Sequence, residues 1–97
     1  MATTPVTVTL TCRAHPSPHV RMQATGDEAV LLDLASEYYF GLNAVGKRVW
    51  QLLSVSPHVQ TAFDALQSEY DVDAAQLERD LLALLQQLAD AGLVRIE

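Results

Sequence analysis

The spacing of apolar residues changes at Asn43, and this change constrains the fold more than any other feature of the sequence. Before Asn43, apolar residues alternate with polar ones, as Val20, Met22 and Ala24 do, which is typical of a half-buried strand. After it, apolar residues recur every three or four positions, which indicates amphipathic helices. A chain of 97 residues in which strands precede helices predicts a single α+β domain.

The first half of the chain predicts a three-stranded antiparallel sheet. Residues 20–24, 29–34 and 38–42 carry the strand patterns, and turn sequences at 25–28 and 35–37 separate them. Because each connection is short, successive strands are expected to pair as a meander.

The segment before this sheet is harder to assign. Residues 6–13 also alternate, with Val8, Leu10 and Cys12 among the apolar positions, and the sequence His-Pro-Ser-Pro at 15–18 then breaks regular structure. We expect residues 1–18 to form an N-terminal arm or an extra strand, and residues 19–97 to form the domain.

Three helices are predicted after the sheet. Asn43 is suited to cap the first, which extends to about Ser54. Gly46 within this helix costs roughly 1 kcal/mol relative to alanine, so we expect a close packing contact there. Ser56 and Pro57 fit the cap and first position of the second helix.

The third helix has clear boundary signals. Asp73 and Gln76 form a capping-box pattern at its start, and Gly92 follows its expected end at about Ala91. Residues 93–96 are expected to add a short strand or to dock against the domain.

This third helix carries more apolar surface than its own burial requires. One stripe at helical spacing consists of Leu77, Leu81, Leu84 and Leu88, and a shoulder beside it carries Leu82, Leu85, Ala89 and Glu78. Either the small domain wraps this helix on two sides, or the shoulder is one wall of an open apolar groove of the kind that binds peptides. The third strand is the natural other wall, because an edge strand offers free backbone hydrogen-bonding groups.

The charge and composition exclude several classes of protein. The net charge is −6, and the basic residues are scattered along the chain: Arg13, Arg21, Lys47, Arg48, Arg79 and Arg95. Nucleic-acid binders usually concentrate positive charge on one face, so no nucleic-acid partner is expected. The apolar runs are too short to cross a bilayer, no secretion signal is visible, and the chain has a single cysteine. Together these features predict a cytoplasmic protein without a membrane partner.

No pattern of catalytic or metal-binding residues is present in the sequence. His15 and His19 have the spacing of a helical ligand pair, but Pro16 and Pro18 make a helix improbable there. Cys12 lies on a predicted strand without an activating partner nearby in sequence, and no glycine loop could hold a phosphate. We therefore predict no catalytic residue, no metal and no cofactor, and a protein that is not an enzyme.

The order and spacing of several segments resemble a known family. The sequence Ala-Val-Leu-Leu-Asp-Leu at 29–34 precedes Tyr-Tyr-Phe-Gly-Leu-Asn at 38–43, and Gly46 and Trp50 follow on the first helix. Together with a leucine-rich third helix that ends in Gly-Leu-Val, these segments resemble the PqqD-like domains, also called recognition elements of ribosomally synthesised and modified peptides. The resemblance covers roughly residues 19–96.

The resemblance implies a fold and a function. It implies a winged helix–turn–helix-like domain with a three-stranded sheet and three helices. It also implies a non-catalytic adaptor that binds the leader of a ribosomally made precursor peptide and brings a modifying enzyme or leader peptidase to it. The strand over residues 38–43 resembles the stand-alone leader-binding proteins of lasso-peptide biosynthesis, and a PqqD-type chaperone for a radical SAM enzyme is the alternative.

The resemblance also implies where the leader binds. The leader would add as a strand beside Tyr38, Tyr39, Phe40, Gly41 and Leu42, and the helix wall would be Glu78, Leu81, Leu82 and Leu85. Within this set we expect Leu82 and Leu85 to form a pocket and Glu78 to pair with a basic leader residue. Phe40 and Leu42 alternate with Tyr39, so they are alternatively core residues.

Two other functions remain open from the sequence. A winged-helix DNA-binding protein would carry basic residues on a recognition helix, but residues 57–70 contain no Lys or Arg, and the third helix contains only Arg79. An oligomerisation module would bury the wide apolar face of the third helix in a homodimer.

Overall fold

The computed structural model describes residues 7–97, and the predicted meander forms within it. Strands β2 (Val20–Thr25), β3 (Glu28–Asp33) and β4 (Tyr38–Leu42) pair antiparallel in the order β2-β3-β4. Alternate residues of β3, among them Ala29 and Leu31, are buried, and β3 and β4 pack on the first helix. The sheet is therefore apolar on the face that the helix covers, as the two-residue period requires.

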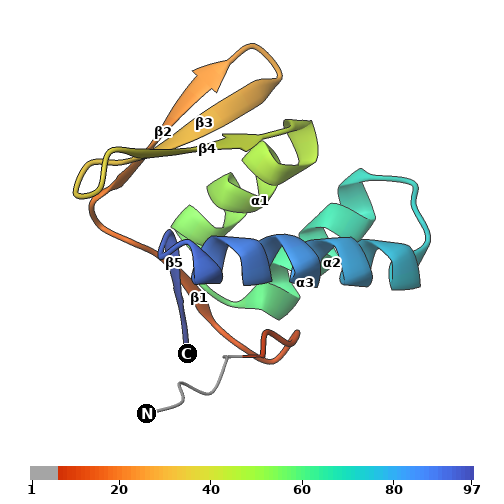
Figure 1. Cartoon of the computed structure of the whole chain (residues 1–97). Helices are drawn as coiled ribbons and strands as arrows, with labels where there is room; N and C mark the ends of the chain where they lie inside the picture. The colour runs from red at the N-terminus through yellow and green to blue at the C-terminus, as the bar shows by residue number, and fades with distance from the viewer. Residues whose placement is uncertain (1–6) are drawn as a thin grey trace.

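Three helices follow the sheet, as predicted: α1 (Ala44–Val55), α2 (Val59–Glu69) and α3 (Ala74–Asp90). Helix α1 packs against β3 and β4 on one side and against α2 on another (Figure 1). Helix α3 packs chiefly against α2 and the C-terminal strand. The predicted three-stranded sheet followed by three helices is confirmed, and its likeness to a winged helix–turn–helix stays a prediction.

Local signals at the ends of α1 and α3 form as expected. The Asn43 side chain accepts a hydrogen bond of 2.8 Å from the Gly46 amide, and the Asp73 side chain accepts one of 3.1 Å from the Gln76 amide. At the end of α3, Gly92 has a φ of 76°, and the amide of Leu93 donates to the carbonyl of Leu88. These bonds satisfy backbone groups that a helix end leaves free.

The close contact expected at Gly46 is present. A Cβ atom at this position would lie 3.1 Å from Cδ2 and 3.3 Å from Cβ of Leu42. Leu42 is the last residue of β4 and is buried, so the missing side chain lets α1 start directly beneath the strand. Glycine therefore permits the close approach of α1 to the end of β4.

The predicted start of α2 is wrong. Ser56 ends α1, Pro57 and His58 are outside regular helix, and α2 begins at Val59 without a side-chain cap. The Pro57 carbonyl accepts a hydrogen bond of 2.8 Å from the Ala14 amide, and Arg13 bridges His58. Pairing with a distant segment therefore takes the backbone groups that a local helix start would use.

Of the two possibilities left open for the N-terminal segment, residues 7–12 do not form a regular strand. Residues 10–12 form a turn, and the regular strand is β1 (Ala14–Pro16), which includes part of the sequence expected to break structure. It pairs antiparallel with β5 (Val94–Ile96), so of the two alternatives for residues 93–96 the short terminal strand is the one that forms. Residues 12–16 therefore lie between β5 on one side and the α1–α2 connection on the other.

Candidate functional site

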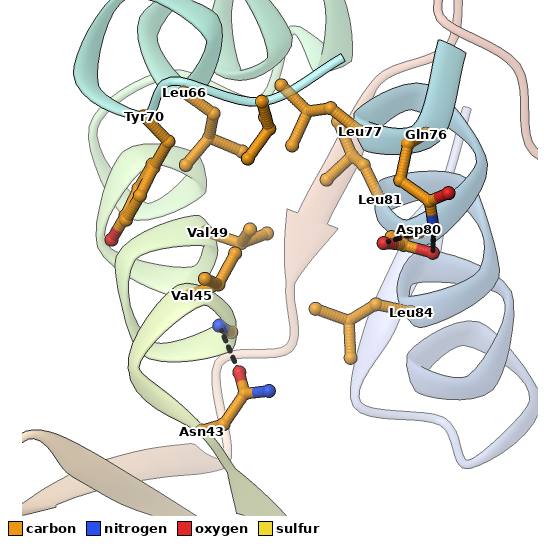
Figure 2. Close-up of a pocket in the computed structure, with 12 residues that line it drawn as sticks. Asn43, Val45, Val49, Leu66, Tyr70, Gln76, Leu77, Asp80, Leu81 and Leu84 are labelled. Atoms are coloured by element: carbon orange, nitrogen blue, oxygen red, sulfur yellow. Dashed lines mark hydrogen bonds between the residues drawn. The ribbon is translucent and has the colours of Figure 1, made fainter. Parts of the chain in front are cut away.

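A cavity of about 310 Å³ opens between α1 and α3. Figure 2 shows Val45 and Val49 of α1 facing Leu81 and Leu84 of α3 across it. Its lining is mostly apolar, with polar groups in a few places, and comprises Asn43, Val45, Gly46, Val49, Leu66, Tyr70, Val72, Gln76, Leu77, Asp80, Leu81 and Leu84. Few polar groups around an apolar hollow are typical of a binding site.

A second, more open hollow lies at the other end of β4. It is lined by Ser36, Glu37 and Tyr38 at the start of the strand and by Ala91 at the end of α3. The first cavity reaches Asn43, directly after β4, and Leu84 of α3. The two hollows thus mark opposite ends of the strand.

These hollows define what we call the β4–α3 groove, between Tyr38–Leu42 and the side of α3 that carries Leu84 and Ala91. Leu84 and Ala91 are seven positions apart, which is about two helical turns, so they lie on one face. Only β3 pairs with β4 among residues 7–97, so the other edge of β4 has no strand partner there. The groove therefore combines free backbone hydrogen-bonding groups with an apolar wall.

The five predicted strand residues all lie in β4, but their side chains point to two faces. Tyr39 and Gly41 lie opposite Leu32 and Val30 on the outer face of the sheet, and Tyr39 is 66% exposed. Tyr38 is also exposed, whereas Phe40 is half-buried and Leu42 is buried against the core. The alternative that Phe40 and Leu42 pack in the core is thus the one that the structure shows.

The four predicted helix residues differ in burial and in whether they line a hollow. Leu81 is buried on the floor of the cavity, and Leu85 is fully buried in the core. Glu78 and Leu82 line neither hollow. Leu85 has no accessible surface to offer a peptide in this structure, and its role in a pocket stays a prediction.

These differences in burial depend on which flank of α3 is covered by the rest of the chain. The buried stripe consists of Leu77, Leu81, Leu85 and Leu88. Leu84, which was predicted in this stripe, instead lies half-buried on one flank of it. On the opposite flank, the Val8 amide lies 3.4 Å from Oε1 of Gln86, four residues after Leu82. Within residues 7–97, the N-terminal segment therefore lies on the side of Leu82, whereas Leu84 lines the cavity.

Sequence reasoning missed the groove residues Gln76, Asp80 and Leu84 as a set. They follow each other at four-residue spacing, which places them on one face of α3. The Nε2 atom of Gln76 donates to both carboxylate oxygens of Asp80, at 3.2 and 3.1 Å, as Figure 2 shows. A carboxylate that accepts hydrogen bonds from its own helix therefore stands at the edge of the apolar cavity.

A bidentate ion pair holds α1 against the end of α2 beside this cavity. Arg48 donates from Nε and Nη2 to the two carboxylate oxygens of Glu69, at 2.8 and 2.7 Å. These hydrogen bonds raise the pKa of Arg48 and lower the pKa of Glu69. The guanidinium is thus already engaged by a carboxylate and does not neutralise Asp80.

The turn that leads into β4 is organised by Asp33. Its side chain accepts hydrogen bonds from the amides of Ala35, at 2.9 Å, and Ser36, at 3.4 Å. Burial acts to raise the pKa of Asp33, but these hydrogen bonds, with a smaller contribution from His19, outweigh it and leave the pKa below its ordinary value. The turn fixes where Tyr38 begins the edge strand.

Residues 7–97 contain neither a group of side chains that could hold a metal ion nor a helix that could cross a membrane. No three His, Cys, Asp or Glu side chains lie close enough together to hold a metal ion. None of the helices in this part of the chain combines the length and apolar character needed to cross a membrane.

The sequence matches one family model and two curated relatives. The family model is that of coenzyme PQQ synthesis protein D (PqqD), and it matches residues 28–94. The relatives are PqqA binding proteins of Rhodopseudomonas palustris, strains ATCC BAA-98 / CGA009 and TIE-1. They are 32% and 30% identical over 92 residues, which cover 95% of this chain and 90% of each relative.

Two solved structures have the same fold. TbiB1 in complex with the TbiA(beta) leader peptide is 41% identical, with a TM-score of 0.78 over 84% of this chain and 94% of that one. Lasso peptide synthetase B1, complexed with the leader peptide, is 29% identical, with a TM-score of 0.75 over 86% of this chain and 98% of that one. Both of these proteins, TbiB1 and lasso peptide synthetase B1, were solved with a leader peptide bound.

Proposed function

Because this chain belongs to the PqqD family, we propose that it is an adaptor that binds the leader of a ribosomally made precursor peptide. The observation that carries this proposal is the chain's 41% identity to a protein solved with a leader peptide bound, in a match that covers 84% of this chain. The adaptor delivers the precursor to a separate modifying enzyme or leader peptidase. Its role is to raise the effective concentration of the core peptide at that enzyme, and it contributes no catalytic step.

The leader adds as a strand to the free edge of β4. The five residues Tyr38–Leu42 span about 17 Å in extended conformation, enough to pair with a leader segment of similar length. Backbone hydrogen bonds to β4 give affinity and register, and leader side chains that reach the two hollows give specificity. The exposed rings of Tyr38 and Tyr39 border the bound strand.

The helix wall of the groove consists of Gln76, Asp80, Leu84 and Ala91, with Leu81 beneath them. This set replaces Glu78, Leu82 and Leu85 because only the flank with Leu84 opens on the two hollows. The strand wall stays as predicted, with Phe40 and Leu42 contributing backbone groups rather than exposed side chains.

We propose a lasso-peptide pathway for this adaptor, as the sequence resemblance implied. The structural likeness to lasso peptide synthetase B1 supports this assignment. The 30–32% identity to PqqA binding proteins supports the alternative, a PqqD-type chaperone for a radical SAM enzyme. Titration against a lasso-type leader and against PqqA, the peptide that the curated relatives are named for, separates the two.

A pair of matched variants tests the groove. Leu82 and Leu84 are both half-buried leucines of α3, two positions apart, and they point to opposite flanks. We expect Leu84→Asp to abolish the anisotropy rise of a fluorescently labelled leader from the nearest precursor gene, and Leu82→Asp to retain it. Circular dichroism confirms that both variants are folded. Loss of binding in Leu82→Asp alone would contradict this placement of the wall.

A further inference from the structure

We propose that the cavity between α1 and α3 selects a lysine or arginine of the leader, and that Asp80 is the residue that determines this specificity. The inference rests on the proposed function and goes beyond it, since it names a chemical requirement of the peptide. It follows from three observations on the cavity: its apolar walls, its single carboxylate and the charges around it.

The walls of the cavity suit the stem of a long side chain. Val45 and Val72 are 37% and 47% exposed, and Leu84 and Tyr70 are half-buried. The methylene stem of a lysine or arginine covers such apolar surface while its charged end stays near water. Asp80 is the charged residue among those that line the cavity.

Asp80 accepts hydrogen bonds from Gln76 and still has capacity to accept others. Gln76 donates one amide group to both oxygens, whereas an ionised carboxylate has about four acceptor positions. Among residues 7–97, no Lys, Arg or His lies within 4.0 Å of Asp80, since the ion pairs there involve other carboxylates. A cation from the leader would supply the missing partner through a charge-assisted hydrogen bond.

The position of this carboxylate distinguishes it from two similar ones. The same Gln-to-Asp hydrogen bond at four-residue spacing occurs at Gln60–Asp64 in α2 and at Gln86–Asp90 in α3. Neither of those pairs lines the cavity, whereas Gln76 and Asp80 both do. The motif is thus an ordinary surface feature elsewhere and becomes a candidate recognition group only at the cavity.

The charges near the cavity favour a cationic occupant. Neither basic residue of α1 lines the cavity, since Lys47 donates to the Gly26 carbonyl at 2.9 Å and Arg48 is paired with Glu69. The chain as a whole carries a net charge of −6. A basic leader residue therefore meets a complementary potential, and an acidic residue at the same place is repelled.

The test uses a labelled synthetic leader from the precursor gene nearest to this one, with each Lys or Arg replaced in turn by norleucine. One replacement is expected to weaken binding about tenfold, the size of one charge-assisted hydrogen bond. Asp80→Asn is expected to weaken binding of the unmodified leader by a similar factor. The two losses should not add when combined, because they remove the same interaction.

Asp90→Asn is the matched control, because it removes the same charge beside the same type of glutamine away from the cavity. It is expected to bind the unmodified leader as tightly as the wild type does. If the wild type fails to bind the unmodified leader, the adaptor proposal itself fails. If the wild type binds but Asp80→Asn binds no more weakly than Asp90→Asn, or no Lys or Arg replacement matters, the inference on Asp80 is overturned and the adaptor stands.

Discussion

Truncation of Leu85 to alanine is predicted to cost stability rather than peptide contacts. This side chain is fully buried between the other leucines of the α3 stripe. Leu85→Ala removes apolar atoms worth roughly 2 kcal/mol of transfer free energy, and the cavity left behind adds to this, so we expect a loss of about 3–4 kcal/mol. A chain of 97 residues has a total unfolding free energy on the order of 5–15 kcal/mol, so the loss is a large share.

Leu82 provides the comparison. It is half-buried on the other flank of the same helix, so Leu82→Ala is expected to cost about 1 kcal/mol. Urea denaturation followed by circular dichroism measures both losses, and leader binding is measured on the folded fraction of each variant. Equal losses in the two variants, or a stable Leu85→Ala protein that no longer binds leader, would refute the placement of Leu85 in the core.

Two further predictions concern the ends of β4. A glycine-to-alanine change stabilises an ordinary helix by roughly 1 kcal/mol, but Gly46→Ala is expected to leave the unfolding free energy unchanged or lower, because the new Cβ would crowd Leu42 at 3.1 Å. Urea denaturation measures this, and a gain of the full ~1 kcal/mol would show that Leu42 shifts at little cost. The lowered pKa of Asp33 means that its ionised form stabilises the fold above the unfolded pKa of about 3.9 and that this contribution is lost as the pH falls through the lower folded pKa. Asp33→Asn should therefore be less stable than the wild type near neutral pH, and the difference should shrink below about pH 4 in urea titrations at several pH values; a constant difference would exclude this linkage.

The parts of the fold that depend on nearby residues follow from the sequence. The change of period at Asn43 marks the boundary between sheet and helices, and Asp73 and Gly92 delimit α3 where expected. Each of these signals acts within about one helical turn, since caps bond to amides or carbonyls a few residues away. Local chemistry is therefore enough to predict them.

The parts that depend on distant residues do not follow from the sequence. The start of α2 is displaced because Pro57 bonds to Ala14, more than forty positions earlier. The short strand Ala14–Pro16 exists because Val94–Ile96 pairs with it, although its own sequence contains a proline. No local pattern reports such a partner, and tertiary pairing overrides propensity here.

The open flank of α3 could not be predicted from the sequence for the same reason. Both flanks of α3 carry leucine, so periodicity alone cannot tell which flank the rest of the chain covers. A contact between Val8 and Gln86, 78 positions apart, shows that it is the flank of Leu82. The free edge of β4 was easier to predict, because an edge strand is defined by its place in a meander.

Amide hydrogen exchange with and without the labelled leader tests strand addition to β4 most directly. The two edge strands of the sheet are β2 and β4, so Val20–Thr25 serves as the control for Tyr38–Leu42 within one molecule. The account predicts that saturating leader slows exchange of amides in Tyr38–Leu42 and leaves Val20–Thr25 unchanged, because new backbone hydrogen bonds form on one edge alone. Protection of Val20–Thr25, or binding without any protection in Tyr38–Leu42, would contradict it.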